Sequence, residues 1–173
     1  MKFEKDISIL IRINSIIFVL LPFTLITGPF LPDLFISILG LSFIYISIKE
    51  RKFQYYKNFF VYTFALFYFY LLIRGILSDY PFEFLIKYNG PVFYFRYLFF
   101  VLCIVFLLEN NSKLLNQFTY SLLFVVILSS LDGYFQWIFG FNFFGFTSPS
   151  IRVTGVFRDE EILGHFYLMS FHY

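Results

Sequence analysis

Long apolar runs alternate with short polar stretches along the whole chain. Five of the runs are long enough to form transmembrane helices, namely Ile7–Thr27, Pro32–Ile48, Asn58–Leu77, Pro91–Leu108 and Phe118–Phe139. At 1.5 Å per residue such helices are roughly 25 to 33 Å long, which matches a hydrocarbon core of about 30 Å. The pattern predicts an all-α fold, a polytopic transmembrane helical bundle with five full spans.

The chain becomes apolar again after its last polar stretch. The segment Glu161–Tyr173 would extend only about 20 Å as a helix, which is too short to cross a bilayer. We therefore expect the start of a sixth span here. We interpret residues 1–173 as a single transmembrane domain and as the N-terminal portion of a longer protein. No internal repeat and no Ser- or Gly-rich linker divides the sequence.

The composition also favours a lipid environment. Hydrophobic residues make up 60% of the chain and charged residues only 14%, whereas soluble domains carry about 25% charged residues. The lipid bilayer is therefore an expected partner. The net charge of +2 and the absence of a basic tract exclude nucleic acid. The single cysteine, Cys103, cannot form an intrachain disulfide.

Basic residues gather at alternate ends of the predicted spans. They are Lys2, Lys5, Lys49, Arg51, Lys52, Lys57 and Lys113. Because such residues favour the cytoplasmic side, we expect a cytoplasmic N-terminus and an extracytoplasmic position for the third and fifth loops. The third loop, 78–90, contains Glu83 and Lys87 at helical i,i+4 spacing and predicts a short interfacial helix. The fifth loop comprises residues 140–160.

Four polar side chains lie in the outer halves of predicted spans. They are Arg74, Arg96, Asp132 and Gln136. Ionisable groups inside a membrane are functional candidates by default. Asp132 and Gln136 are four residues apart and share one helix face. Arg74 is expected to extend to the interface. Arg96 has two interpretations, a structural pair with Asp132 or a ligand for an anionic group such as a diphosphate.

The most polar stretch is Ile151–Tyr167, which holds two arginines and three consecutive acids. The acids at 159–161 are typical of the first turn of a helix, where the helix dipole favours them. His165 lies four residues after Glu161, but no defined third ligand accompanies them, so we predict no metal. Walker, GxSxG and HExxH motifs are absent, which argues against the common soluble enzymes.

Two segments carry a resemblance to a known family. The run LDGYFQWIFGFNFFG at 131–145, followed by RVTGVFRDE at 152–160, resembles the O-antigen ligase/O-antigen polymerase superfamily of bacterial membrane glycosyltransferases. In that family an Asp-x-x-x-Gln on one helix precedes a Gly-x-Asn/Asp-x-x-Gly turn, and an Arg-x-x-Gly-x-Phe segment opens the next helix. The similarity covers roughly 74–167. Arg158 departs from the pattern, which commonly has a small residue or glycine there.

The resemblance implies an activity and a set of site residues. Such proteins move a glycan from undecaprenyl diphosphate to an acceptor sugar hydroxyl at the outer face of the bacterial inner membrane, without a cofactor. A ligase uses a lipid A-core acceptor in lipopolysaccharide biosynthesis, and a polymerase joins repeat units of a surface polysaccharide. By analogy Arg152 and Arg96 are the expected catalytic residues. The expected substrate-binding residues are Asp132, Gln136, Gly155 and Glu160.

Two alternatives to this function remain open. A membrane transporter or flippase for a lipid-linked or anionic solute would explain the intramembrane arginines equally well. A purely structural membrane subunit would use Arg96 and Asp132 as an internal tie. The family's later half, with further arginine and histidine residues thought to serve catalysis, has no counterpart in residues 1–173, so we expect the catalytic base beyond Tyr173.

Overall fold

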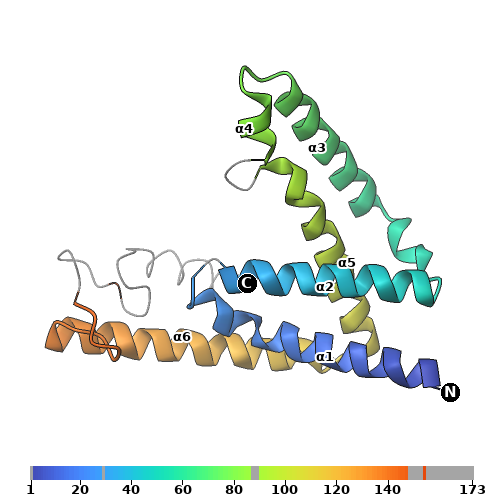
Figure 1. Ribbon diagram of the computed structural model, residues 1–173. Helices are drawn as coiled ribbons and strands as arrows, with labels where there is room; N and C mark the ends of the chain where they lie inside the picture. Colours follow the sequence, from blue (N-terminus) through green and yellow to red (C-terminus); the bar gives the residue numbers. More distant parts are fainter. Residues whose placement is uncertain (1, 29, 87–89, 148–153, 155–173) are drawn as a thin grey trace. The chain divides into compact units, whose positions relative to one another are not determined.

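The computed structural model describes residues 2–28, 30–86, 90–147 and 154. Within these ranges the structure is helical (Figure 1). The α-helices are α1 (Lys2–Leu25), α2 (Phe30–Lys49), α3 (Phe59–Ile76), α4 (Pro81–Ile86), α5 (Phe95–Asn110) and α6 (Leu114–Phe139). Two short 3-10 helices are η1 (Phe53–Tyr56) and η2 (Pro91–Tyr94). The described residues contain no strand, only an isolated bridge between Phe141 and Thr147.

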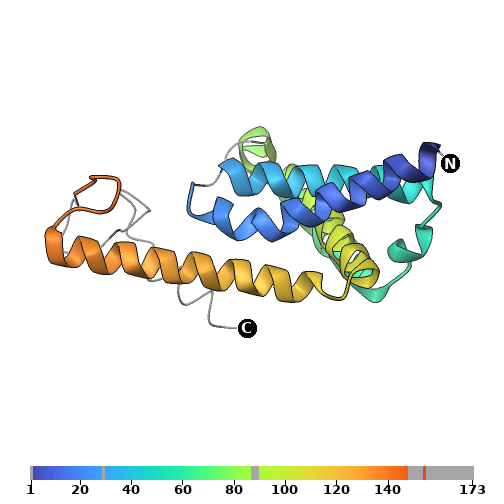
Figure 2. The same cartoon turned by 90° about the horizontal axis from the view of Figure 1, so that it is seen from below.

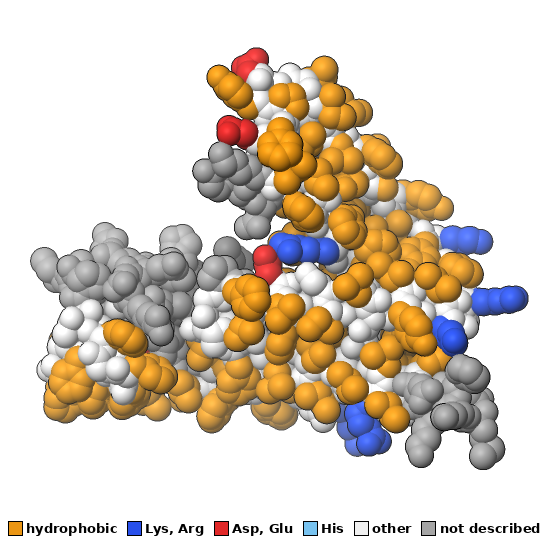
Figure 3. All heavy atoms as spheres, viewed as in Figure 1, with side chains coloured by type: hydrophobic (Ala, Val, Ile, Leu, Met, Phe, Trp, Pro, Cys, Tyr) orange, Lys and Arg blue, Asp and Glu red, His pale blue; other side chains and the backbone are white. Residues whose placement is uncertain are grey.

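Five helical segments are long and apolar enough to cross a membrane. They are Ile7–Leu25, Phe30–Lys49, Phe59–Ile76, Pro81–Asn110 and Leu114–Phe139. Large apolar side chains cover the visible surface of these helices (Figure 3). The predicted all-α membrane fold with five spans is thereby confirmed, and the lipid bilayer is its environment. The predicted start of a sixth span lies outside the described residues.

The fourth span is built differently from its prediction. The apolar run from Pro91 predicted a continuous helix, whereas the structure has η2 at Pro91–Tyr94 and begins α5 at Phe95. Proline suits a first helical position because it needs no hydrogen-bond acceptor for its nitrogen. The short helix expected in the third loop is present as α4. Lys87, the expected partner of Glu83, lies outside the described residues.

The chain divides into two compact units, of which the first comprises residues 1–15 and 34–111. In it, α2 approaches α5 at Gly40, where a Cβ atom would lie 3.3 Å from the carbonyl oxygen of Arg96. Helix α3 packs on α4 at Gly75, where a Cβ atom would collide with Leu85. The hydroxyl of Tyr68 donates to a backbone carbonyl of η2 at 3.0 Å. Small residues therefore set the close helix contacts of this unit.

The second unit comprises residues 16–33 and 112–173. The second half of α1 packs along the first half of α6. Phe18 stacks on Phe118 with ring centroids 4.6 Å apart. The hydroxyl of Ser121 donates to the carbonyl oxygen of Val19 at 2.6 Å. Figure 2 shows α6 continuing, at its far end, into the loop that carries the candidate site.

Candidate functional site at the end of helix α6

Helix α6 ends in a glycine with a left-handed backbone. Gly140 has φ +79°, and its N–H donates to the carbonyl of Gln136 at 2.8 Å. A Cβ atom at Gly140 would meet nothing within 4 Å. The glycine is therefore needed for its backbone angle and not for space.

Asn142 closes the loop after this glycine. Its side-chain Oδ1 accepts the N–H groups of Phe144 at 3.0 Å and Phe146 at 2.8 Å. Its own N–H donates to the carbonyl of Phe146 at 3.0 Å, and its carbonyl accepts the N–H of Gly145 at 2.9 Å. Gly145 has φ +82°, a second left-handed position. The Gly-x-Asn-x-x-Gly sequence thus forms a closed turn in which one asparagine replaces several backbone partners.

Asp132 fastens this turn to the helix. The side chain is fully buried, and its Oδ1 accepts the N–H of Phe143 at 2.8 Å. Its Oδ2 is buried and has no hydrogen-bond partner among the described residues. A buried polar oxygen without a partner costs free energy. The Oδ2 atom of Asp132 therefore destabilises the fold, while the hydrogen bond to Oδ1 stabilises the turn.

Gln136 holds two segments of the chain. Its Oε1 accepts the N–H of Thr154 at 2.9 Å, and its Nε2 donates to the Thr154 hydroxyl at 3.2 Å. The same Nε2 donates to the carbonyl of Phe146 at 3.4 Å. Gln136 and Thr154 are both buried. One amide thereby satisfies a donor and acceptors of an irregular backbone, as a non-helical segment at a membrane requires.

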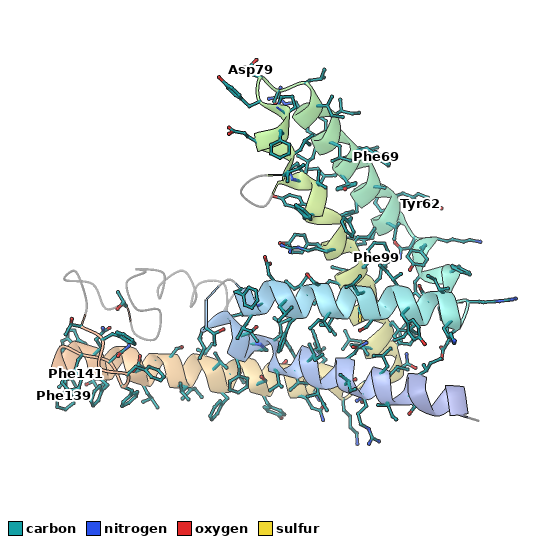
Figure 4. The ribbon with its side chains drawn as sticks, in the orientation of Figure 1. Tyr62, Phe69, Asp79, Phe99, Phe139 and Phe141 are labelled. Atoms are coloured by element: carbon teal, nitrogen blue, oxygen red, sulfur yellow. The ribbon has the colours of Figure 1, made fainter. Side chains whose placement is uncertain are left out.

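Aromatic rings support the loop from beside these polar groups. Phe135 packs on Phe139 and Phe143, with centroids 4.5 Å apart in each pair, and meets Phe141 at 5.7 Å. Figure 4 shows Phe139 and Phe141 together at the end of α6. The sequence pattern showed neither this cluster nor the part played by Thr154.

The structure brings together two of the predicted substrate-binding residues. As the i,i+4 spacing predicted, Asp132 and Gln136 share one face of α6, and their hydrogen bonds reach the loop backbone and Thr154. This arrangement orders a loop at the end of a membrane helix. Substrate binding by Asp132 and Gln136 stays a prediction.

Arg96, a predicted catalytic residue, stands in the first turn of α5. It is half-buried, its Nη2 donates to the Tyr97 hydroxyl at 3.2 Å, and its guanidinium carbon lies 5.1 Å from the centre of that ring. This geometry suits a cation–π contact. Arg96 belongs to the first unit and Asp132 to the second, so their pairing stays a prediction.

The remaining predicted site residues lie outside the described residues. They are Arg152, Gly155 and Glu160. Thr154, the anchored residue, stands next to Gly155 and two positions after Arg152 in the sequence. Within the described ranges no group of three His, Cys, Asp or Glu side chains is placed to hold a metal ion.

Comparisons with known proteins leave the family open. No protein family model, no curated protein and no solved structure matches this chain.

Proposed function

We propose that this membrane protein is a glycosyltransferase of the O-antigen ligase/polymerase type. It would move a glycan from undecaprenyl diphosphate to an acceptor sugar hydroxyl, on a lipid A-core or a growing polysaccharide. The observation that carries the proposal is the ordered loop after α6. Asp132, Gln136 and Asn142, three residues on which the resemblance rests, all belong to its hydrogen-bonded structure.

The loop supports the proposal because its anchor lies close to an arginine in the sequence. Gln136 anchors Thr154, and Arg152 precedes Thr154 by two residues. A guanidinium offers paired N–H donors to phosphate oxygens and stays charged, so Arg152 is the proposed ligand of the diphosphate, with Arg96 assisting. Gly155 and Glu160 would complete the substrate site. The proposed location is the outer face of the bacterial inner membrane, with the N-terminus in the cytoplasm.

The proposed reaction is a displacement at the anomeric carbon of the donor sugar. The acceptor hydroxyl forms the new glycosidic bond and loses its proton, and the bond to the diphosphate breaks. Negative charge develops on the leaving diphosphate, where arginine side chains in a site with little water stabilise it. Removing such a stabilising group commonly lowers kcat by about 100-fold to 1,000-fold.

The test uses Arg152→Ala and Arg96→Ala, with Arg74→Ala as the matched control because Arg74 is exposed in the last turn of α3. Glycan transfer from undecaprenyl diphosphate is measured in membranes with equal protein levels. We expect a loss of about 100-fold for Arg152→Ala, a smaller loss for Arg96→Ala and no loss for the control. Wild-type transfer by both variants would remove the proposed roles.

A second assay separates the transferase from a transporter or flippase, which Arg96 would serve equally well. Purified protein in detergent has no two compartments, so transport cannot occur there. Release of undecaprenyl diphosphate with formation of a new glycosidic bond in detergent supports the transferase. Movement of the lipid-linked glycan in vesicles, without any turnover in detergent, supports the transporter.

A further inference from the structure

The turn between α2 and α3 concentrates positive charge. Its exposed basic residues include Arg51 and Lys57, and its acid Glu50 lies 3.9 Å from the ammonium group of Lys52. Lys and Arg side chains project where α2 ends and η1 begins (Figures 1 and 3). Between Lys49 and Asn58 the chain carries four basic residues and one acid.

Aromatic packing holds this turn in place. The Tyr55 ring lies edge-on to Phe43 and to Phe106, with centroids 5.8 Å apart in both pairs. The Tyr56 hydroxyl lies 2.8 Å from Oγ of Ser47, within hydrogen-bond distance. The turn is therefore fastened to α2 and α5 and presents its cations from a fixed backbone.

Asn58 then starts the next helix. Its Oδ1 accepts the N–H of Val61 at 2.9 Å, and its Nδ2 donates to the carbonyl of Tyr55 at 3.0 Å. This cap joins the turn to the first residues of α3, so the backbone is defined from the end of one span to the start of the next.

Tyr55 also engages an acid of the neighbouring helix. Its hydroxyl donates a hydrogen bond to the Glu109 carboxylate. Burial first, and then the Glu109 carboxylate, raise the pKa of Tyr55 to about 12. The phenol therefore stays a neutral donor at physiological pH. Glu109 thus has a neutral hydroxyl partner on the turn, and the side chains of Arg51 and Lys57 are exposed.

The position of the turn places these cations at the membrane surface. It joins two candidate spans, Phe30–Lys49 and Phe59–Ile76. Phe53 is 49% exposed and Phe59 is 85% exposed, beside the basic residues. Exposed apolar side chains next to basic residues suit the boundary between the acyl chains and the lipid headgroups, where phosphate esters are the abundant anions.

We propose that the α2–α3 turn is a binding surface for the phosphate groups of anionic phospholipids, with Arg51, Lys52 and Lys57 as the ligands. The guanidinium of Arg51 binds phosphate oxygens through paired N–H donors, and the two ammonium groups add point charges. The proposal is independent of the glycosyltransferase activity.

Native mass spectrometry of the purified protein with phosphatidylglycerol tests the proposal. The test variant carries Arg51→Gln, Lys52→Gln and Lys57→Gln. The matched control carries Lys2→Gln, Lys5→Gln and Lys113→Gln and loses the same charge elsewhere. If each of the three cations that contact one headgroup contributes roughly a fivefold change in affinity, the test variant is expected to bind about 100-fold more weakly. The control residues lie outside the turn and make no such contact in the proposal. The control should stay within about threefold of wild type, and zwitterionic phosphatidylcholine should bind weakly to all three.

Two outcomes would overturn the lipid surface. Equal losses in both triple variants would show that net charge alone attracts the lipid. Displacement of phosphatidylglycerol by an equal concentration of inorganic phosphate would identify a small-anion site instead. Helix content by circular dichroism checks that each variant is folded.

Tyr55→Phe tests whether the order of the turn matters. It removes the hydrogen bond to Glu109 and leaves every basic residue in place. We expect phosphatidylglycerol affinity to fall about threefold, the equivalent of one modest hydrogen bond. Affinity equal to wild type would contradict a contribution of the Tyr55–Glu109 hydrogen bond to the lipid site.

Discussion

Two irregular segments in this membrane protein are held by opposite means. The α2–α3 turn is fastened by aromatic rings and hydroxyl groups, and its basic side chains Arg51 and Lys57 are exposed. The loop after α6 is fastened by buried polar side chains of the helix itself, Asp132 and Gln136, which bond to its backbone. The first segment could change its charges without losing its fold. In the second segment, loss of Asp132 or Gln136 would leave backbone groups of the loop without their hydrogen-bond partners.

The two segments differ in the kind of helix side chain that holds them, apolar rings in the first and buried hydrogen-bonding groups in the second. Aromatic packing gains free energy from apolar area alone and tolerates exposure of the polar groups above it. A buried amide or carboxyl group in a membrane helix costs free energy unless its hydrogen bonds are made. A protein that places such groups at the end of α6 therefore depends on a defined loop conformation there, which is what a substrate site needs.

The largest expected effect comes from Gln136→Leu. This change keeps the approximate size of the side chain but removes the Gln136 partner of the Thr154 N–H and of the Thr154 hydroxyl. The Phe146 carbonyl loses a weak bond at 3.4 Å and keeps the N–H of Asn142. Unsatisfied buried groups cost about 1 to 3 kcal/mol each, and partial relaxation makes a total of about 2 to 3 kcal/mol reasonable. Thermal unfolding in detergent measures it, and hydrogen exchange at Thr154 should become at least tenfold faster.

Gln117→Leu is the control for Gln136→Leu, because Gln117 is exposed on the same helix. It should change neither the exchange at Thr154 nor the free energy of unfolding by more than about 0.5 kcal/mol. If the two variants behave alike, the amide of Gln136 does not hold the loop and the comparison fails.

A smaller effect is expected at Asp132. Asp132→Ala removes the acceptor of the Phe143 N–H, a loss of about 1 to 3 kcal/mol when that donor is left without this partner. It also removes the buried Oδ2, which has no partner among the described residues, and so relieves part of the cost. We expect a net loss of about 1 kcal/mol in unfolding free energy.

Asp132→Asn sharpens this prediction. It keeps an oxygen acceptor for the Phe143 N–H, so its loss should be smaller than that of the alanine variant. Asp79→Ala, at an exposed position between α3 and α4, is the control and should be nearly neutral (Figure 4). A loss larger for asparagine than for alanine would mean that an oxygen acceptor at position 132 does not support the turn.

The spans could be predicted from the sequence because length and apolarity are local properties. The helix from Phe59 to Ile76 lies within one residue of the predicted Asn58–Leu77 at each end. The inward-facing side chains could not be predicted, since lipid accepts apolar residues on every face. Phe43 is fully buried and Leu41, two residues away, is 65% exposed, yet both are apolar.

The candidate site was predictable only in part. Helical spacing put Asp132 and Gln136 on one face, and the glycine and asparagine of 140–145 indicated a turn. Their partners were not predictable. Gln136 and Thr154 are 18 residues apart, and their contact depends on how the left-handed glycines direct the loop. No periodic pattern records such a contact.

The smallest expected effect concerns Tyr55 in the α2–α3 turn and the pH dependence of the unfolding free energy. In the folded protein the pKa of Tyr55 is about 12, above the ordinary value of 10.0. Its contribution to stability is complete below pH 10, where the phenol is protonated in both states, and is lost as the pH rises through 12. Tyr55→Phe should therefore flatten the fall in unfolding free energy between about pH 10 and 12, measured by circular dichroism.

The size of this change is limited by solvent. Tyr55 is only half-buried, so screening keeps the contribution below about 1 kcal/mol. Tyr80→Phe, at an exposed position outside the spans, should leave the pH profile parallel to that of wild type. Parallel profiles for Tyr55→Phe and wild type would mean that Glu109 and Tyr55 do not interact in solution. The α2–α3 turn would then be held by its rings and by the contacts of Tyr56 and Asn58, without a bond to an acid. The contrast with the buried carboxyl group that anchors the α6 loop would be stronger.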